Sequence, residues 1–126
     1  MAKKIIEVKK APRPIGPYSQ AVEANGVLYI SGQIAMDADT NELMLGTIKE
    51  ETTQVLRNLQ AILLKYDLSF SHVVKASIFL SSMDHFNAVN EVYATCFKEE
   101  EPARETVAVA GLPKNVNVEI SLIAVR

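Results

Sequence analysis

The feature that most constrains the fold is a long amphipathic pattern in the middle of the chain. Thr47 and Glu50 have the spacing of a capping box, in which two side chains each bond the other residue's backbone amide at a helix start. Apolar residues then recur at helical intervals: Val55, Leu56, Leu59, Ile62, Leu63 and Tyr66. The pattern predicts a helix over about residues 47–66 whose apolar face needs a second layer to cover it.

A β-rich run, Val73 to Leu80, comes next and is apolar at every even position. It predicts a central strand, because such residues suit a pleated, half-buried surface. Asp84 then has the residue type of an N-cap for a second helix. That helix is expected to bury an apolar stripe: Phe86, Val89, Tyr93 and Phe97. Cys96 lies beside the stripe and is expected to be a packed core thiol rather than a nucleophile.

The first third of the chain predicts strands around a stiff loop. Ile5 to Val8 is an apolar run that can form a first strand. The segment 11–18 holds three of the five prolines, which exclude a helix and predict an extended loop. Asn25-Gly26 lies between apolar-rich runs at 21–24 and 27–30, and both residues tolerate positive φ. This dipeptide predicts a hairpin whose second strand continues into Ser31-Gly32-Gln33.

The last third predicts two further strands, Ala103 to Ala110 and Asn115 to Val125. If residues 111–114 form a hairpin loop, Thr106 lies opposite Glu119 and Arg104 lies diagonally beside Glu119 on the same face. One face then collects Val107, Val109, Val116, Val118, Ile120 and Leu122. The other face collects Arg104, Thr106, Ala108, Asn117, Glu119 and Ser121.

These elements predict one α+β domain over residues 1–126, with a mostly antiparallel sheet and two helices packed on one face. Two helices can cover only one face. The other face would still show apolar side chains between polar ones: Tyr29, Val73, Phe79, Ile123 and Val125. A monomer rarely exposes such a mixture, so we expect the protein to oligomerise through its sheet.

Composition narrows the class of protein. The net charge is −2, and the only concentration of basic residues is near the start of the chain, so we expect no nucleic-acid partner. No apolar stretch approaches the roughly 18 residues of a membrane span, and the first residues lack the apolar run of a secretory signal. We therefore expect a soluble cytoplasmic protein. One cysteine and two histidines at unrelated positions predict neither a disulfide nor a metal site.

Arg104 and Glu119 are the main candidates for chemistry. The planar fork of arginine binds a carboxylate through two parallel hydrogen bonds, and a nearby glutamate can hold or deprotonate water. The alternative is a structural salt bridge between the two residues inside an oligomer interface. A second candidate cluster is Tyr18 on the stiff loop with Ser31-Gly32 at a strand end. The alternative interpretation of this cluster is a turn in which the tyrosine has only a packing role.

Several motifs resemble one family. They run along the whole chain in order: Ile15 to Ala21, Leu28 to Ile34, Val55 to Leu59, Val74 to Leu80, Phe86 to Tyr93, Pro102 to Arg104, Leu112-Pro113 and Val118 to Ile120. Together they resemble the RidA/YjgF family of reactive-intermediate deaminases. The resemblance implies a chorismate-mutase-like fold and a homotrimer with sites between subunits. It also implies cofactor-free hydrolysis of 2-imino and enamine acids to 2-keto acids and ammonia.

The resemblance also implies roles for individual residues. Arg104 is expected to hold the substrate carboxylate and Glu119 to orient or activate the attacking water. Tyr18 is expected to close the pocket, with support from Ser31, Gly32 and Asn90. The backbone carbonyl of Thr106 is expected to act at the imine nitrogen. Many members have cysteine where this chain has Thr106, and a second acidic residue where it has Ser121. A thiol-dependent role is therefore not expected.

Two other functions compete with deamination. The same scaffold can bind 2-keto acids as a non-catalytic sensor, although the presence of both Arg104 and Glu119 favours catalysis. Ribonuclease activity or translation inhibition has also been attached to this family. The acidic balance, the absence of a basic stripe and the absence of a histidine pair argue against that label.

Overall fold

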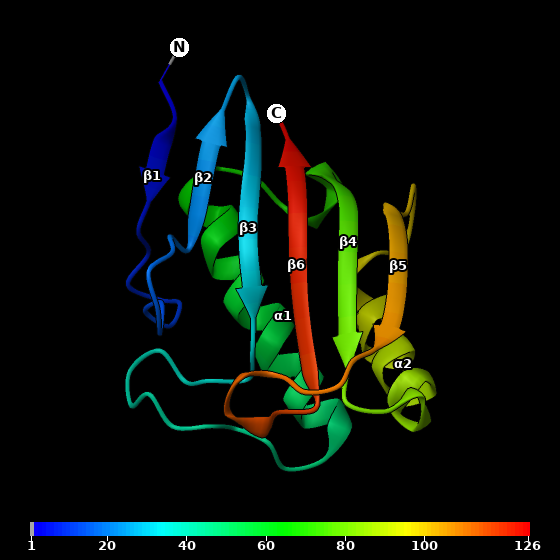
Figure 1. The fold of residues 1–126 in the computed structure, drawn as a ribbon. Coiled ribbons are helices and arrows are strands. Elements are labelled where there is room, and N and C mark those ends of the chain that lie inside the picture. Colours follow the sequence, from blue (N-terminus) through cyan, green and yellow to red (C-terminus); the bar gives the residue numbers. More distant parts are fainter. Residues whose placement is uncertain (1) are drawn as a thin grey trace.

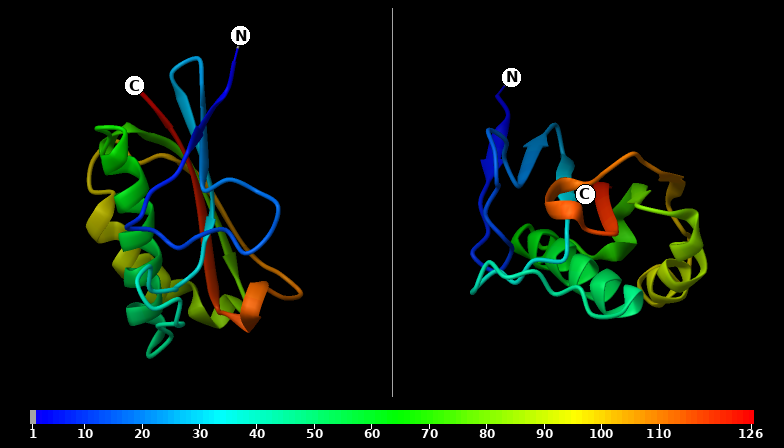
Figure 2. Two further views of the ribbon diagram at one scale, coloured as in Figure 1. Left: turned by 90° about the vertical axis from the view of Figure 1, so that its left-hand side faces the viewer. Right: turned by 60° about the horizontal axis from the view of Figure 1, so that its bottom comes forward.

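The computed structural model describes residues 2–126. Six strands form one sheet in the order β1-β2-β3-β6-β4-β5 (Figure 1). The strands are β1 Lys4–Ile6, β2 Ala21–Ala24, β3 Val27–Gln33, β4 Val73–Leu80, β5 Ala103–Ala108 and β6 Val118–Val125. The helices α1 Ile48–Lys65 and α2 Phe86–Cys96 both lie on one side of this sheet (Figure 2). The predicted α+β class, with two helices on one sheet face, is confirmed.

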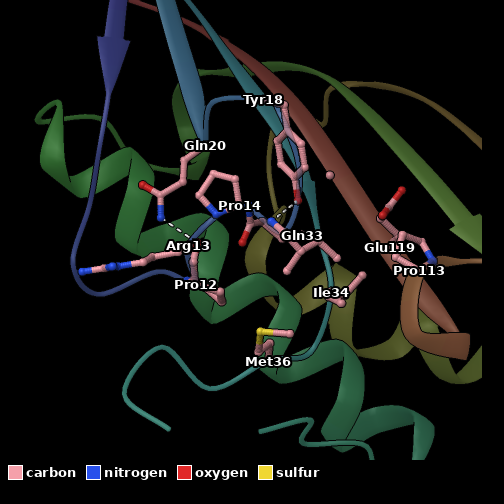
Figure 3. A pocket seen from close by; sticks show the side chains of 12 residues that line it. Pro12, Arg13, Pro14, Tyr18, Gln20, Gln33, Ile34, Met36, Pro113 and Glu119 are labelled. Atoms are coloured by element: carbon pink, nitrogen blue, oxygen red, sulfur yellow. Dashed lines mark hydrogen bonds between the residues drawn. The ribbon is translucent and has the colours of Figure 1, made fainter. Parts of the chain in front are cut away.

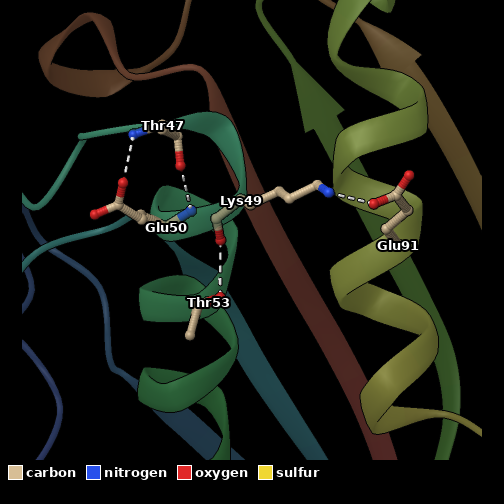
Figure 4. A network of polar contacts seen from close by, with 5 residues as sticks. All are labelled: Thr47, Lys49, Glu50, Thr53 and Glu91. Carbon is tan, nitrogen blue, oxygen red and sulfur yellow. Dashed lines mark hydrogen bonds and ion pairs between the residues drawn. The ribbon is translucent and has the colours of Figure 1, made fainter.

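Helix α1 confirms the prediction for residues 47–66 and begins with the expected capping box. The Thr47 hydroxyl accepts a hydrogen bond from the Glu50 amide at 3.1 Å, and the Glu50 carboxylate accepts one from the Thr47 amide at 3.2 Å (Figure 4). The same figure shows an exposed ion pair from Lys49 to Glu91 of α2. The apolar face of α1 packs on the sheet, with Val55, Leu59 and Ile62 fully buried.

Removing this cap tests how far α1 depends on it. We expect Thr47→Ala to lower the free energy of unfolding by about 1 kcal/mol, because the Glu50 amide in the first turn loses its acceptor. Thr53→Ala is the matched control, since the Thr53 hydroxyl only donates to the carbonyl of Lys49 within the helix, at 2.8 Å. Urea unfolding of both variants at one protein concentration measures the difference. Equal losses would contradict the capping contribution.

The N-terminal hairpin also forms as predicted. Asn25 and Gly26 both have positive φ, 52° and 78°, and Ala24 pairs with Val27 across the turn. The first strand covers Lys4–Ile6 and lies at the sheet edge against β2. A long connection then carries the chain from β3 to α1, and a short bridge joins Met36 to Leu43 within it.

The predicted hairpin of residues 103–110 and 115–125 is wrong. Strand β5 pairs in parallel with β4, and β6 lies between β3 and β4 (Figure 1). Thr106 is therefore paired with Ile78, and Glu119 with Phe79. The physical reason is that α2 connects β4 to β5 as a crossover, which makes the two strands parallel neighbours. The chain then returns through a short 3₁₀ turn, Pro113–Asn115, to place β6 inside the sheet.

The new pairing changes which face Arg104 occupies. Along β6 the buried side chains are Val118, Ile120 and Leu122, which face the helices as predicted. Arg104 is paired with Ala76, which is fully buried, and its guanidinium lies against the rings of α2, so it also faces the helices. Val107, predicted to be in the core, is instead 42% exposed on the open face. The predicted assignment of side chains to the two faces of the sheet is thus right for β6 and reversed for β5.

Helix α2 confirms its predicted stripe but not its predicted cap. Val89, Tyr93 and Phe97 are buried, whereas Phe86 is half-buried. Asp84 does not cap the helix, because a 3₁₀ turn over Met83–His85 precedes it and the Asp84 amide donates to the hydroxyl of Ser82. Cys96 packs against the core, and burial raises the pKa of its thiol, which keeps it protonated. The structure therefore supports the packed-thiol prediction.

The face of the sheet away from the helices is partly apolar. Tyr29 is 48% exposed there, and its strand neighbours include Val22 and Ile123. Val73, which was expected on this face, is buried instead, because a bulge between Val73 and Lys75 turns it toward the core. Oligomerisation through this face stays a prediction. Within residues 2–126, no helix has the length and apolar character required to cross a membrane.

Candidate functional site

The first candidate site is a hollow that contains Glu119, which we call the Glu119 pocket. It is lined by the stiff loop of residues 11–18, which we call the proline loop, by the end of β3 and the residues after it, and by the start of β6. Its volume is about 30 Å³. Tyr18, Pro113 and Glu119 are among its lining residues (Figure 3). Gly32 also lines it. The structure thus brings together three of the side chains or backbone positions that the sequence predicted as functional.

Glu119 fits closely against Gly32. A Cβ atom on Gly32 would lie 2.8 Å from the carboxyl carbon of Glu119, so a larger residue there would force this carboxylate to move from its present position. Among residues 2–126 no group forms an ion pair or a hydrogen bond with it, and the side chain of Arg13 extends away from it (Figure 3). Burial raises the pKa of Glu119 above the usual glutamate value. An unpaired, partly desolvated carboxylate of this kind can accept a proton from water.

The proline loop is held in place by one buried amide. The Gln20 side chain is 4% exposed and donates to the carbonyls of Val8, Ala11 and Pro12. Its amide oxygen accepts a hydrogen bond from the Val8 amide at 2.6 Å. Tyr18 is 47% exposed at the end of this loop, and its hydroxyl accepts a hydrogen bond from the Ile15 amide. The tyrosine is therefore at the rim of the pocket and not in the core.

The neighbouring predicted residue, Ser31, is already engaged. Its hydroxyl donates to the carbonyl of Ser19 at 2.6 Å, which ties β3 to the proline loop. The ladder between β3 and β6 is irregular between Ile30 and Gln33. Ser31-Gly32 therefore lies inside β3, one residue before its end, where the strand pairing is interrupted next to Glu119. The Ser31 amide is not free to bind a ligand, because it donates to the carbonyl of Gln20 at 2.9 Å.

Two polar residues of α1 that are not among the candidates predicted from the sequence support the other walls of the pocket. Asn58 is buried and donates to the carbonyls of Ile34 and Met36, at 3.1 and 3.0 Å. Glu51 is fully buried and accepts three hydrogen bonds from Asn117 and Val118, directly before Glu119. Both residues lie on the core-facing stripe of α1. A polar residue at an otherwise apolar helical position was the signal that could have revealed them.

A second hollow, which we call the Arg104 pocket, lies beside α2. Its volume is about 360 Å³, and its lining includes Asn90, Tyr93, Glu101 and Arg104. The guanidinium carbon of Arg104 lies 4.8 Å from the centre of the Tyr93 ring. Within residues 2–126, Arg104 forms no ion pair, and its guanidinium donates no hydrogen bond. The guanidinium is therefore free to bind an anion from outside the chain.

The structure places the predicted residues in two groups and not in one. Tyr18, Gly32 and Glu119 share the Glu119 pocket, whereas Asn90 and Arg104 share the Arg104 pocket. The predicted contact between Arg104 and Glu119 within one chain is wrong, because β4 lies between their strands and the two side chains are on opposite faces of the sheet. Thr106 lies on the helix side next to Arg104, and its hydroxyl is buried with no partner among residues 2–126.

The residues that the structure describes do not form a cluster suited to bind a metal ion. In the part of the chain that the structure describes, no three histidine, cysteine, aspartate or glutamate side chains gather around a common point. The fold and the two pockets define an α+β protein with a carboxylate and a guanidinium that are each open to a small polar ligand.

Comparison with known proteins identifies the family. The chain matches the family described as Endoribonuclease L-PSP over residues 8–126. A relative in Dermatophagoides farinae, named 2-iminobutanoate/2-iminopropanoate deaminase, is 46% identical, and the alignment covers 98% of this chain and 96% of the relative. The chain therefore belongs to this family, which is the RidA/YjgF family that its motifs resemble.

Solved structures confirm the fold. A Thermotoga maritima protein, described as a candidate endoribonuclease, is 51% identical with a TM-score of 0.94, covering 98% of this chain and 97% of that one. E. coli TdcF with bound serine is 38% identical with a TM-score of 0.91, covering 98% of each chain. The architecture is thus the predicted chorismate-mutase-like α+β fold. The names of the similar proteins divide between deaminase and endoribonuclease.

Proposed function

We propose that this protein hydrolyses reactive 2-imino and enamine acids to 2-keto acids and ammonia. The observation that carries the proposal is a guanidinium and a partly buried carboxylate that both lack partners within residues 2–126. Leaving two charged groups unpaired has no benefit for folding, so their presence favours a ligand that uses them. The deaminase name of the Dermatophagoides relative supports this reaction class.

The opposite placement of these groups supports a site between copies of the chain. Arg104 of one copy and Glu119 of another can meet at one substrate if the Arg104 pocket of the first abuts the Glu119 pocket of the second. Such a contact is heterologous, and it closes into a ring if the rotation between copies is suitable. We propose the homotrimer implied by the family motifs as that ring.

The proposed reaction needs only positioning and proton transfer. Arg104 binds the substrate carboxylate through its planar fork, which holds the imine carbon near Glu119. Glu119 takes a proton from water as the water oxygen bonds to that carbon, and it passes this proton to the imine nitrogen, which becomes an amine. The new hydroxyl group then gives up its proton, through Glu119, to the amine, the carbon–nitrogen bond breaks, and ammonia and a 2-keto acid remain. The raised pKa of Glu119 makes its carboxylate a stronger base than an ordinary glutamate.

A trapping assay tests the proposal directly. A serine dehydratase generates 2-aminoacrylate, and semicarbazide competes with the protein for the imine that forms from it. We expect the protein to lower the amount of semicarbazone in proportion to its concentration. Unchanged trapping at protein concentrations well above that of the dehydratase would contradict the proposed activity.

Ligand sensing is the second candidate, and a bound amino acid in a relative favours it. E. coli TdcF was solved with serine, which shares the carboxylate of a 2-imino acid. A protein that binds 2-ketobutyrate but does not accelerate imine loss would support sensing. Nuclease activity has weaker support, because the net charge is −2 and the charged pair described above is suited to a carboxylate substrate.

The fit between Gly32 and Glu119 predicts a strong effect of a single methyl group. We expect Gly32→Ala to displace the Glu119 carboxylate and to lower kcat/KM for imine hydrolysis by about 100-fold, the contribution of a positioned base. Gly111→Ala is the matched control, because a Cβ there meets nothing within 4 Å. The coupled dehydratase assay measures both variants. A Gly32→Ala protein with the activity of the control would contradict the role of Glu119.

The raised pKa of Glu119 predicts the acid limb of the pH profile. A base acts only when it is ionised, so kcat/KM is expected to fall as the pH drops through the pKa of Glu119. Burial raises that pKa, which places the inflection above 4.5, the ordinary glutamate value. Rates of imine loss measured across the acid range, corrected for spontaneous hydrolysis, test this. A rate that does not fall anywhere in the acid range would rule out Glu119 as the titrating base.

A further inference from the structure

Aromatic rings, and not polar groups, hold Arg104. Its guanidinium carbon lies 4.8 Å from the centre of the Tyr93 ring and 5.8 Å from that of Phe86, and both rings belong to α2. An aromatic ring attracts a cation through the negative charge of its face, without using a hydrogen-bond acceptor. The five N–H donors of the guanidinium therefore stay available for a carboxylate.

Tyr93 is itself rigidly placed. It is 6% exposed, and its ring stacks on Phe97 with centres 4.4 Å apart. Phe97 in turn meets Phe70 edge to face, with centres 5.0 Å apart. This aromatic column, formed by Phe70, Phe97 and Tyr93, extends from the core to Arg104. A buried, stacked ring has little freedom to move, so it can hold the guanidinium in one position.

The ring of Tyr93, and not its hydroxyl, makes this contact. The hydroxyl oxygen is buried and has no hydrogen-bond partner within residues 2–126. Burial raises the pKa of Tyr93, which keeps the hydroxyl neutral, so it supplies no negative charge to Arg104.

We propose that Tyr93 is a positioning residue that presents the Arg104 guanidinium to the substrate carboxylate through its ring face. The inference rests on the proposed function, because it assumes that Arg104 binds a carboxylate. It gives a functional role to a residue for which the sequence pattern predicts only packing. It also specifies the mechanism, since phenylalanine should replace tyrosine at this position and leucine should not.

Binding and kinetics together test the proposal. We expect Tyr93→Leu to raise the KM for 2-iminobutanoate and the Kd for 2-ketobutyrate about 3- to 30-fold, the range of a partly buried cation–π contact, with little change in kcat. Tyr93→Phe should match the wild type in all three quantities. Isothermal titration with 2-ketobutyrate and the coupled assay supply the measurements.

Two further variants separate positioning from packing. Phe70→Leu removes a ring from the same aromatic column but does not touch Arg104, so it should lower stability and leave KM unchanged. Phe86→Leu removes the more distant ring from a half-buried position and should raise KM less than Tyr93→Leu does. It also provides a test if Tyr93→Leu fails to fold.

The possible outcomes separate the positioning role of Tyr93 from the proposed deaminase function. Unchanged Kd for 2-ketobutyrate in Tyr93→Leu and in Phe86→Leu would overturn the positioning role while leaving the deaminase function intact. An equal loss in Tyr93→Phe and Tyr93→Leu would assign the effect to the hydroxyl and also overturn it. A wild-type protein that binds 2-ketobutyrate but hydrolyses no imine would contradict the deaminase function alone. A wild type that does neither contradicts both.

Discussion

Arg104→Ala and Glu119→Gln are each expected to lower imine hydrolysis by about 100-fold or more, and mixing the two variants is expected to restore about a quarter of the wild-type activity. We expect activity to be restored because of where the sheet places the two side chains. Within one chain the two side chains are on opposite faces, with β4 between their strands. A site that uses both must then combine two copies. In a randomly mixed ring, about one contact in four joins an intact Arg104 to an intact Glu119.

The mixing experiment has an internal control. The two variants are refolded together from denaturant, and native mass spectrometry establishes that mixed oligomers form. Arg104→Ala mixed with the double variant Arg104→Ala/Glu119→Gln should stay inactive, because no contact contains an intact arginine. Mixed oligomers of the two single variants without any gain in activity would contradict a site shared between copies.

Glu51→Ala is expected to lower the free energy of unfolding by about 3–5 kcal/mol, since each buried donor left unpaired costs about 1–3 kcal/mol. Glu51 is fully buried, and one carboxylate oxygen accepts from the amides of Asn117 and Val118, at 2.8 and 3.0 Å. The other oxygen accepts from the side-chain amide of Asn117 at 2.9 Å. These bonds attach α1 to the start of β6, directly before Glu119.

A second glutamate provides the comparison for this prediction. Glu91 forms an ion pair with Lys49 across the two helices, but both side chains are more than half exposed (Figure 4). We expect Glu91→Ala to change stability by about 0.5 kcal/mol or less, because water and salt weaken such pairs. Chemical denaturation at a fixed protein concentration compares the two variants. A Glu51→Ala protein as stable as Glu91→Ala would contradict the structural role of Glu51.

Local features of the fold were predictable because local sequence carries them. The capping box at Thr47, the helical spacing of the apolar residues after it, and Asn25-Gly26 each specify backbone geometry within a few residues. The alternation along β6 identified which of its side chains face the core. The cap of α2 was not predictable from Asp84 alone, because the 3₁₀ turn before the helix shifts its start.

The candidate residues themselves came from residue types and family motifs, and their arrangement did not. Sequence alone named Arg104, Glu119, Tyr18 and Gly32, and the structure places the last three in one pocket. The helical pattern could mark Glu51 and Asn58 as polar residues on the buried face of α1, but it could not show that they support that pocket. Their hydrogen-bond partners lie far along the chain, and only the folded structure brings them together.

The sequence by itself determined the elements, the α+β class and the family, because periodicity, turn residues and motifs are local properties of the chain. Only the tertiary structure decided which strands are neighbours. Alternation assigns side chains to two faces of a strand, but it does not say which strand pairs with which or in which direction. Helix α2 makes β5 a parallel neighbour of β4, and this turns Arg104 toward the helices while Glu119 faces the other side.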